Sequence, residues 1–202
     1  MSRFILFIVW LLAGAAVHAA QNVLVFGDSL SAGYGIRSAE AWPSLLGERL
    51  RTQKSDYALV NASLSGETTA GGRTRLPTAL QQHRPQVVII ALGANDGLRG
   101  LSLDAMRSNL KAMIDAAQAA RSRVLLVGME MPPNYGPDYT RKFRAVYGEL
   151  ARHSKVALVP FLLDGFAEKR DLFQADGIHP TAAAQPLIVD NVWPTLKPLL
   201  RK

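Results

Sequence analysis

The stretch VLVFGDSLSAGYG, residues 23–35, decides how the fold of this sequence is interpreted. Four apolar residues typical of a buried strand run directly into Gly27, Asp28 and Ser29, and two more glycines follow in the next loop. A polar cluster at the end of a buried strand has two interpretations. Glycine can bend the chain while Asp or Ser caps the helix that follows. Alternatively, the strand is a rigid support for a reactive serine hydroxyl.

Short apolar runs recur along the chain, and helix-like stretches separate them. The runs rich in Val, Ile and Leu are NVLVF (22–26), YALVNA (57–62), VVIIALG (87–93), RVLLVGME (123–130) and KVALVP (155–160). Amphipathic stretches cover 41–51, 72–82, 103–120 and 138–154. Strands buried on both faces are continuously apolar, and alternation of strands with helices indicates a parallel sheet covered on both sides. The sequence therefore predicts a three-layer α/β/α sandwich around a five-stranded parallel sheet.

The last segment, 181–200, is helix-like but contains three prolines. Pro186 suits the first turn of a helix, where its missing N–H removes no hydrogen bond. Pro194 is expected to kink or end the helix, because proline lacks the donor that a helix interior requires.

The first twenty residues are typical of a secretory signal peptide. MSR carries one positive charge, FILFIVWLLAGAA is apolar, and VHAAQ offers small residues at cleavage spacing. Cleavage after Ala19 and after Ala20 fit equally well. The alternative is an uncleaved membrane anchor, but the run is shorter than the about 20 apolar residues that span a bilayer. We therefore expect 1–20 to be removed and 21–202 to form one domain, periplasmic or secreted.

Composition excludes several kinds of site. The chain has no cysteine, which rules out disulfides, a thiolate nucleophile and a Cys-ligated zinc. The formal net charge is +7, or +6 without Arg3, and the cations are scattered in small groups. Without a long basic run, nucleic-acid binding is not expected. A basic surface instead favours encounter with anionic lipid surfaces, so we expect transient contact with a membrane surface, and otherwise a monomer.

Residues that suit nucleophilic catalysis follow three of the predicted strands, and others lie in one loop near the end of the sequence. Ligands bind beyond the carboxyl ends of parallel strands, where these residues are expected to meet. A serine hydroxyl needs a base, and the base needs a carboxylate to orient it. The expected catalytic residues are Ser29, Asp176 and His179. The expected oxyanion-hole donors are the backbone N–H groups of Ser29 and Gly66 and the side-chain amide of Asn95.

Four blocks of the sequence resemble those of the GDSL, or SGNH, hydrolase family. They are FGDSLSAGYG (26–35), NASLSGETTAGG (61–72), LGANDG (92–97) and DGIHP (176–180). The Ser, Gly, Asn and His of that name fall on Ser29, Gly66, Asn95 and His179, with Asp176 as the third member of the triad. GANDGLRG (93–100) and PPNYG (132–136) are similar to the bacterial periplasmic thioesterase/lysophospholipase branch, often called arylesterases.

This resemblance implies a flavodoxin-like sandwich that hydrolyses acyl thioesters, lysophospholipids and aryl or short-chain esters. It implies no metal or other cofactor, an acyl-enzyme intermediate, and an acyl groove shaped in part by a loop over residues 96–100. Asp28 is expected to hold its turn by bonding local N–H groups, and Asp96 to anchor its loop.

Two other functions remain open. One is a metal-dependent phosphoesterase that uses Asp28, Asp96, Asp176 and His179 as ligands. It is disfavoured because Gly66 and Asn95 would then have no clear purpose. The other is a non-catalytic protein that binds lipids or acyl carriers on the same fold, and only the complete set of triad residues argues against it.

Overall fold

A computed structural model describes residues 21–53 and 55–200, so the expected signal peptide lies outside the described residues. One parallel sheet has the strand order β2-β1-β3-β4-β5. Its strands are β1 (Gln21–Gly27), β2 (Tyr57–Asn61), β3 (Val87–Ala91), β4 (Arg123–Val127) and β5 (Ala157–Val159). The predicted five-stranded parallel sheet is confirmed, although β5 is shorter than the run that predicted it.

The buried parts of the central strands are apolar because helices cover both of their faces. Val23 of β1 pairs with Leu59 of β2 on one side and with Val87 of β3 on the other. Every residue of β3 is buried, as are Val23 to Phe26 of β1. This burial gives the sheet a dry centre and makes it a rigid support for the loops at its ends.

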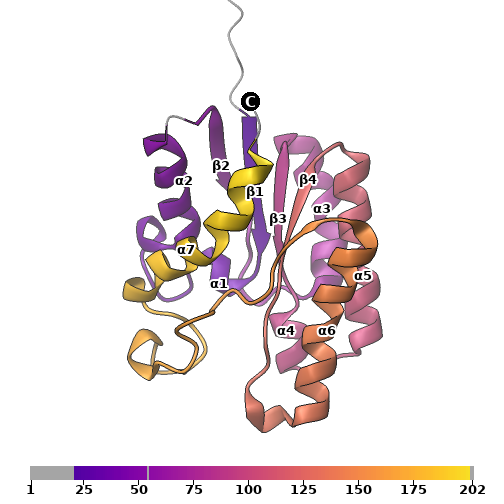
Figure 1. The fold of residues 1–202 in the computed structure, drawn as a ribbon, viewed down its shortest axis with the longest axis vertical. Coiled ribbons are helices and arrows are strands. Elements are labelled where there is room, and N and C mark those ends of the chain that lie inside the picture. Colours follow the sequence, from indigo (N-terminus) through magenta and orange to yellow (C-terminus); the bar gives the residue numbers. More distant parts are fainter. Residues whose placement is uncertain (1–20, 54, 201–202) are drawn as a thin grey trace, which may run out of the picture.

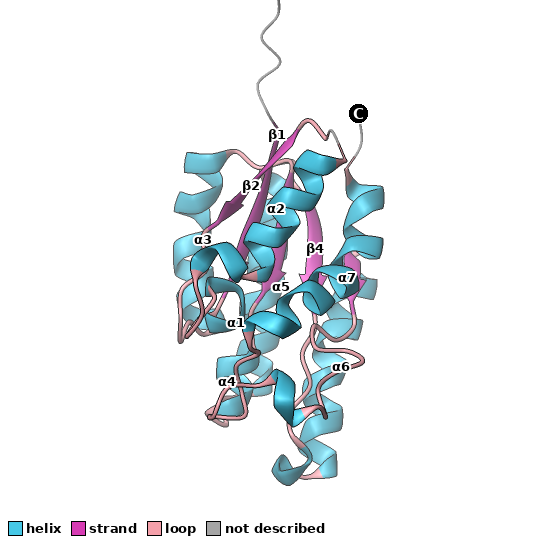
Figure 2. Ribbon diagram, turned by 90° about the vertical axis from the view of Figure 1, so that its left-hand side faces the viewer, coloured by secondary structure: helices cyan, strands magenta, loops and turns pink. Residues whose placement is uncertain are grey.

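The helices form two layers (Figures 1 and 2). On one face α2 (Trp42–Thr52) packs against α7 (Gln185–Leu196). On the other face α5 (Leu103–Ala119) lies between α3 (Thr69–His83) and α6 (Pro137–Ser154). The side chains of Thr68 and Ser102 cap the N-termini of α3 and α5. The three-layer sandwich is thus confirmed.

Short helices follow two of the strands, one where a capped helix was one of two interpretations and one where a loop was expected. The helix α1 (Ser29–Ala32) follows β1, and Asp28 caps it by accepting a hydrogen bond from the Leu30 N–H at 3.1 Å, which confirms the expected role of Asp28. The helix α4 (Ala94–Leu98) follows β3. Gly93 enters it with φ of 119°, a conformation that only glycine adopts readily.

Pro194 was expected to kink or end the last helix, and it does not end it. The helix α7 continues to Leu196, and a 3-10 turn over Lys197–Leu199 follows it. Proline removes a single backbone hydrogen bond, while Ile188, Val189, Val192 and Leu196 bury one face of this helix. Packing therefore outweighs the lost bond.

The carboxyl ends of the strands point toward the lower half of Figure 1, where α1 and α4 begin. This is the edge at which the sequence places its reactive residues. None of the helices formed by residues 21–53 and 55–200 is long and apolar enough to cross a membrane.

Candidate active site

Ser29, His179 and Asp176 form a continuous chain of hydrogen bonds. Ser29 is the first residue of α1, directly after β1, and its Oγ lies 2.8 Å from Nε2 of His179. The other ring nitrogen, Nδ1, lies 2.7 Å from Oδ2 of Asp176. Residues 150 positions apart in the sequence thus meet at the edge of the sheet, in the order nucleophile, base and orienting carboxylate.

A hairpin-like loop presents His179 to Ser29. Phe173 and Pro180 form an antiparallel bridge, and the Gln174 N–H donates to the His179 carbonyl at 2.8 Å. The Gln174 side-chain amide reaches across to the Tyr34 carbonyl, also at 2.8 Å. The Tyr34 ring lies beside the imidazole, with ring centroids 4.5 Å apart. The Gln174 and bridge contacts hold the loop that carries His179, and the Tyr34 ring packs against the imidazole itself.

Asp176 is held as a carboxylate by donors from its own loop. Its Oδ1 accepts hydrogen bonds from the N–H groups of His179 at 3.0 Å and Ile178 at 2.9 Å. The backbone and side-chain hydrogen bonds from His179, followed by that from Ile178, lower the pKa of Asp176 to about 2. The group is therefore ionised at any pH near neutrality and can stabilise a positively charged imidazole.

The three expected oxyanion donors lie at the same edge. Within the described residues, neither the Ser29 N–H nor the Gly66 N–H has a hydrogen-bond acceptor. Gly66 adopts φ of 78°, which explains the glycine at this position. The Asn95 amide is differently placed, because its Nδ2 donates to the Glu67 carbonyl at 3.1 Å and to Oδ2 of Asp28 at 3.4 Å.

Asp28 lies directly beneath this site and is almost completely buried. Burial raises its pKa to about 7, against the lowering effect of the hydrogen bonds from Leu30 and Asn95. Its contact with Asn95 was not foreseen from the sequence, since 67 residues separate the two. No local pattern carries information about such a pair.

Two arginines support the loop that carries Gly66, and the sequence analysis missed both. Arg99 donates to the Gly66 carbonyl at 3.0 Å. The nearly buried Glu67 carboxylate forms a two-bond ion pair with Arg75, whose guanidinium lies 4.0 Å from the centre of the Phe26 ring. The fork-like geometry of arginine makes such pairs rigid.

The four residues of the metal-site alternative do not converge on a common point. Asp28 faces Leu30 and Asn95, both oxygens of Asp96 accept from Thr69, and Asp176 faces its own loop. In the part of the chain that the structure describes, no three acidic or histidine side chains are grouped as metal ligands. The donor set therefore does not fit a metal centre.

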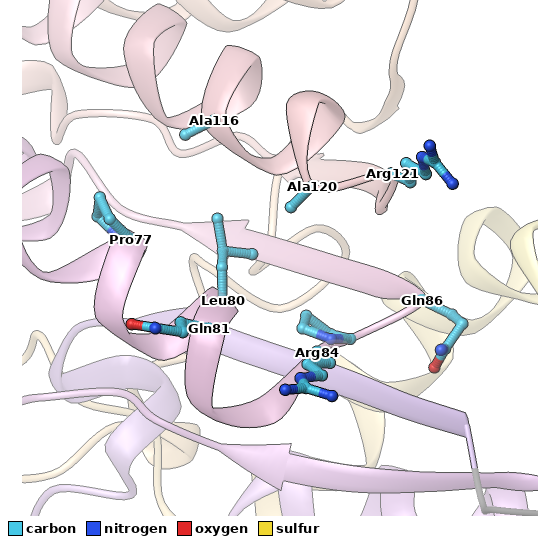
Figure 3. A pocket seen from close by; sticks show the side chains of 9 residues that line it. Pro77, Leu80, Gln81, Arg84, Gln86, Ala116, Ala120 and Arg121 are labelled. Carbon is cyan, nitrogen blue, oxygen red and sulfur yellow. The ribbon is translucent and has the colours of Figure 1, made fainter.

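A separate hollow of about 590 Å³ lies between the C-terminal ends of α3 and α5 (Figure 3). Leu80 and Arg84 line it from one side, and Ala116 and Ala120 from the other. It lies at the amino ends of the strands and includes none of the expected reactive residues.

Comparison with known proteins agrees with this arrangement. The sequence profile described as the GDSL-like lipase/acylhydrolase family matches residues 25–186. The chain is 51% identical over 182 residues to esterase TesA of Pseudomonas aeruginosa, and the aligned residues cover 90% of each protein. It is 42% identical over 195 residues to thioesterase 1/protease 1/lysophospholipase L1 of Escherichia coli K12, covering 96% of this chain and 91% of that protein.

A solved structure shows the same fold. The psychrotrophic esterase EstA from a Pseudoalteromonas species, inhibited by monoethylphosphonate, superimposes with a TM-score of 0.85 at 40% identity. The match covers 90% of this chain and all of that one.

Proposed function

The chain belongs to the GDSL-like lipase/acylhydrolase family and is a serine ester hydrolase, and from this premise we propose that Ser29, His179 and Asp176 are its catalytic triad. The single observation that carries the proposal is the chain of contacts of 2.8 and 2.7 Å that joins the three side chains. Neither the metal-dependent phosphoesterase nor the non-catalytic binding protein is favoured.

In this mechanism Ser29 Oγ attacks the carbonyl carbon of the ester or thioester while His179 Nε2 takes the hydroxyl proton. The Asp176 carboxylate stabilises the imidazolium and holds its Nδ1–H in place. Collapse of the tetrahedral intermediate breaks the bond to the leaving group, which receives the proton from His179. Water then attacks the acyl-enzyme with the same base, and the acid product leaves.

The N–H groups of Ser29 and Gly66 and the amide of Asn95 stabilise the oxyanion. Neither backbone N–H has an acceptor among the residues that the structure describes, so both can donate to the oxyanion. Of its two N–H groups, Asn95 shares the one nearer Asp28 with the oxyanion, because the bond to Asp28, at 3.4 Å, is the longer and weaker of its two. Asn95 keeps its bond to the Glu67 carbonyl and so stays aligned with the Gly66 loop during the reaction.

The substrate class follows from the relatives. One is named an esterase and another a thioesterase and lysophospholipase. We assign to this chain the hydrolysis of aryl and short-chain esters, acyl-CoA thioesters and lysophospholipids. We also propose that the enzyme needs no cofactor, acts as a monomer, and is exported after cleavage of residues 1–20, leaving one domain over 21–202.

The test compares two serines on the same short helix. Ser29→Ala should lower kcat on p-nitrophenyl butyrate and on an acyl-CoA by about 10⁴-fold or more. Ser31→Ala is the matched control, because the Ser31 hydroxyl is buried without a hydrogen-bond partner in the described structure. Its activity should stay within about threefold of wild type, since a buried hydroxyl without a hydrogen-bond partner contributes little to the fold or to the reaction.

An alkylphosphonate should label the wild-type enzyme at Ser29 and leave Ser29→Ala unlabelled, and a chelator should change neither result. Activity of Ser29→Ala within tenfold of wild type, with a native circular dichroism spectrum, would refute the assignment. Labelling at another serine would refute it equally.

A further inference from the structure

Four exposed apolar side chains flank the proposed catalytic residues. Five large apolar side chains are exposed in the described part of the chain, and Tyr34, Leu64, Leu101 and Ile178 are four of them, each exposed by 43–53%. We call these four the apolar rim. Single exposed apolar residues are ordinary on a protein surface, but several around one site mark a surface for interaction.

Two rim residues, Tyr34 and Ile178, lie beside the proposed base His179. The Tyr34 ring lies against the His179 imidazole, with centroids 4.5 Å apart. The Ile178 N–H donates to Asp176, and Ile178 immediately precedes His179. Both side chains are exposed although the backbone that carries them is fixed.

The other two rim residues, Leu64 and Leu101, lie close in sequence to the proposed oxyanion donors Gly66 and Asn95. The Leu64 N–H donates to the carbonyl of Gly27, two residues before Ser29, at 3.0 Å. The Leu101 N–H donates to the carbonyl of Asp96 at 2.9 Å. Leu64 lies two residues before Gly66. The four rim residues therefore lie on, or directly beside, the segments that carry Ser29, Gly66, Asn95 and His179.

Arg99 adds an unpaired positive charge at this place. Its guanidinium bonds to the Gly66 carbonyl, and no carboxylate of the described residues pairs with it. By contrast, Arg37 is paired with Glu40, and Arg75 of α3 is paired with Glu67. The rim thus combines exposed apolar groups with one free cation, in a chain whose formal charge is +7.

We propose that the apolar rim and Arg99 are a docking surface for a phospholipid bilayer, with the rim inserted among the acyl chains and Arg99 beside the phosphates. This rests on the proposed function. A bilayer delivers acyl esters to Ser29, whereas a protein seated on all four loops would cover the nucleophile. Apolar side chains flanked by a cation also match the layered chemistry of a lipid surface, which is apolar below and anionic above.

The test measures binding to vesicles by flotation, with every variant made in a Ser29→Ala background so that no lipid is hydrolysed. Phosphatidylcholine vesicles are compared with vesicles that also contain phosphatidylglycerol. Leu64→Ser combined with Leu101→Ser should weaken binding to both by about tenfold or more, because two inserted leucines are lost. Arg99→Gln should weaken binding about fivefold on the anionic vesicles and leave it unchanged on the neutral ones.

Leu187→Ser is the matched control, because Leu187 is the fifth exposed apolar residue and lies on α7. It should bind within about twofold of its parent. Equal binding by the rim variant, or an equal loss in the Leu187 variant, would overturn the proposal. A rim variant that loses self-association in sedimentation velocity but keeps its vesicle binding would overturn it too, since the rim would then be a protein interface.

Failure of this proposal is distinguishable from failure of the proposed function. Vesicle binding does not require turnover, and all variants share the same N-terminal segment, so differences between them report on the rim. With Ser29 intact, the Leu64 and Leu101 variant should cleave soluble p-nitrophenyl acetate with kcat/KM within about twofold of wild type. Loss of activity on this soluble ester would show that the two leucines act at the reacting site instead.

Discussion

Asp96 accepts two hydrogen bonds from Thr69, one from the backbone N–H at 2.8 Å and one from the hydroxyl at 2.5 Å. Asp96 follows Asn95 in α4, and Thr69 is the first residue of α3, three residues after Gly66. Asn109 of α5 donates to the same hydroxyl at 3.2 Å. This buried pair therefore fixes the distance between the loop that carries Gly66 and the helix that carries Asn95.

Asp96→Ala should lower kcat by about 10- to 100-fold, because the two oxyanion donors lose their common anchor. It leaves the buried Thr69 N–H without an acceptor, so the free energy of unfolding should also fall by about 1–3 kcal/mol. Asp96→Asn is the matched variant, since its amide oxygen can still accept from that N–H, and it should recover most of kcat. KM should change little in either variant. A stability loss with unchanged kcat would show that Asp96 only holds the fold.

Asn95→Ala should lower kcat by about 10²–10³-fold, the usual effect of removing one oxyanion donor. KM for a soluble ester should stay within a few fold, because the amide acts on charge that appears only in the transition state. Steady-state kinetics on a p-nitrophenyl ester separate the two parameters. A variant with raised KM and wild-type kcat would place Asn95 in substrate binding instead.

Asp28 should make stability depend on pH between about pH 4 and 7. Its pKa is raised to about 7 in the folded protein from its ordinary value of 3.8, so in this window the unfolded chain releases a proton that the folded protein retains. The free energy of unfolding therefore falls as pH rises, by on the order of 4 kcal/mol in total, and the fall is complete at about pH 8.

The measurement compares wild type with Asp28→Asn by urea unfolding at several pH values, because the difference cancels the titration of groups common to both. The variant cannot ionise, so its stability relative to wild type should rise steadily from pH 4 to pH 8. Asp176 does not interfere, since its lowered pKa confines its effect to pH values below about 4. A difference that is constant over this range would contradict the buried, proton-retaining state of Asp28.

The sheet and the meeting of the reactive residues could be predicted because both follow from local signals. Continuous apolar runs such as that of β3 report burial on both faces, and residues after parallel strands share one edge. That rule placed Ser29, Gly66 and Asn95 together, and the need of a reactive serine for a base and an orienting carboxylate added the late loop of Asp176 and His179 as the fourth cluster.

What the sequence did not reveal depends on contacts between distant segments. The bond between Asn95 and Asp28, the ion pair between Glu67 and Arg75, and the bond from Arg99 to Gly66 have no local periodicity. The short helix α4 was missed because about one turn of helix has no hydrophobic repeat. The helix α1 was one of two interpretations of its segment, because a cap and a glycine suffice to form it.

Two adjacent glycines of α3 offer a matched test of how tightly this layer is packed. A Cβ on Gly72 would overlap the side chain of Leu92 and lie 3.1 Å from the sulfur of Met113 in α5. A Cβ on Gly71 would meet nothing closer than the Glu67 side chain at 3.5 Å, and Gly71 is exposed. Both positions are helical, so the two substitutions differ mainly in packing.

Gly72→Ala should therefore lower the free energy of unfolding by about 1–3 kcal/mol, because overpacking forces neighbours out of their rotamers. Gly71→Ala should raise it by about 0.5–1 kcal/mol, since alanine loses less backbone entropy in a helix than glycine does. Urea unfolding of the two single variants measures both values. Equal effects at the two positions would mean that α3 moves to accept the methyl group, and the close contact of α3 with Leu92 and Met113 would then not be a fixed feature of the core.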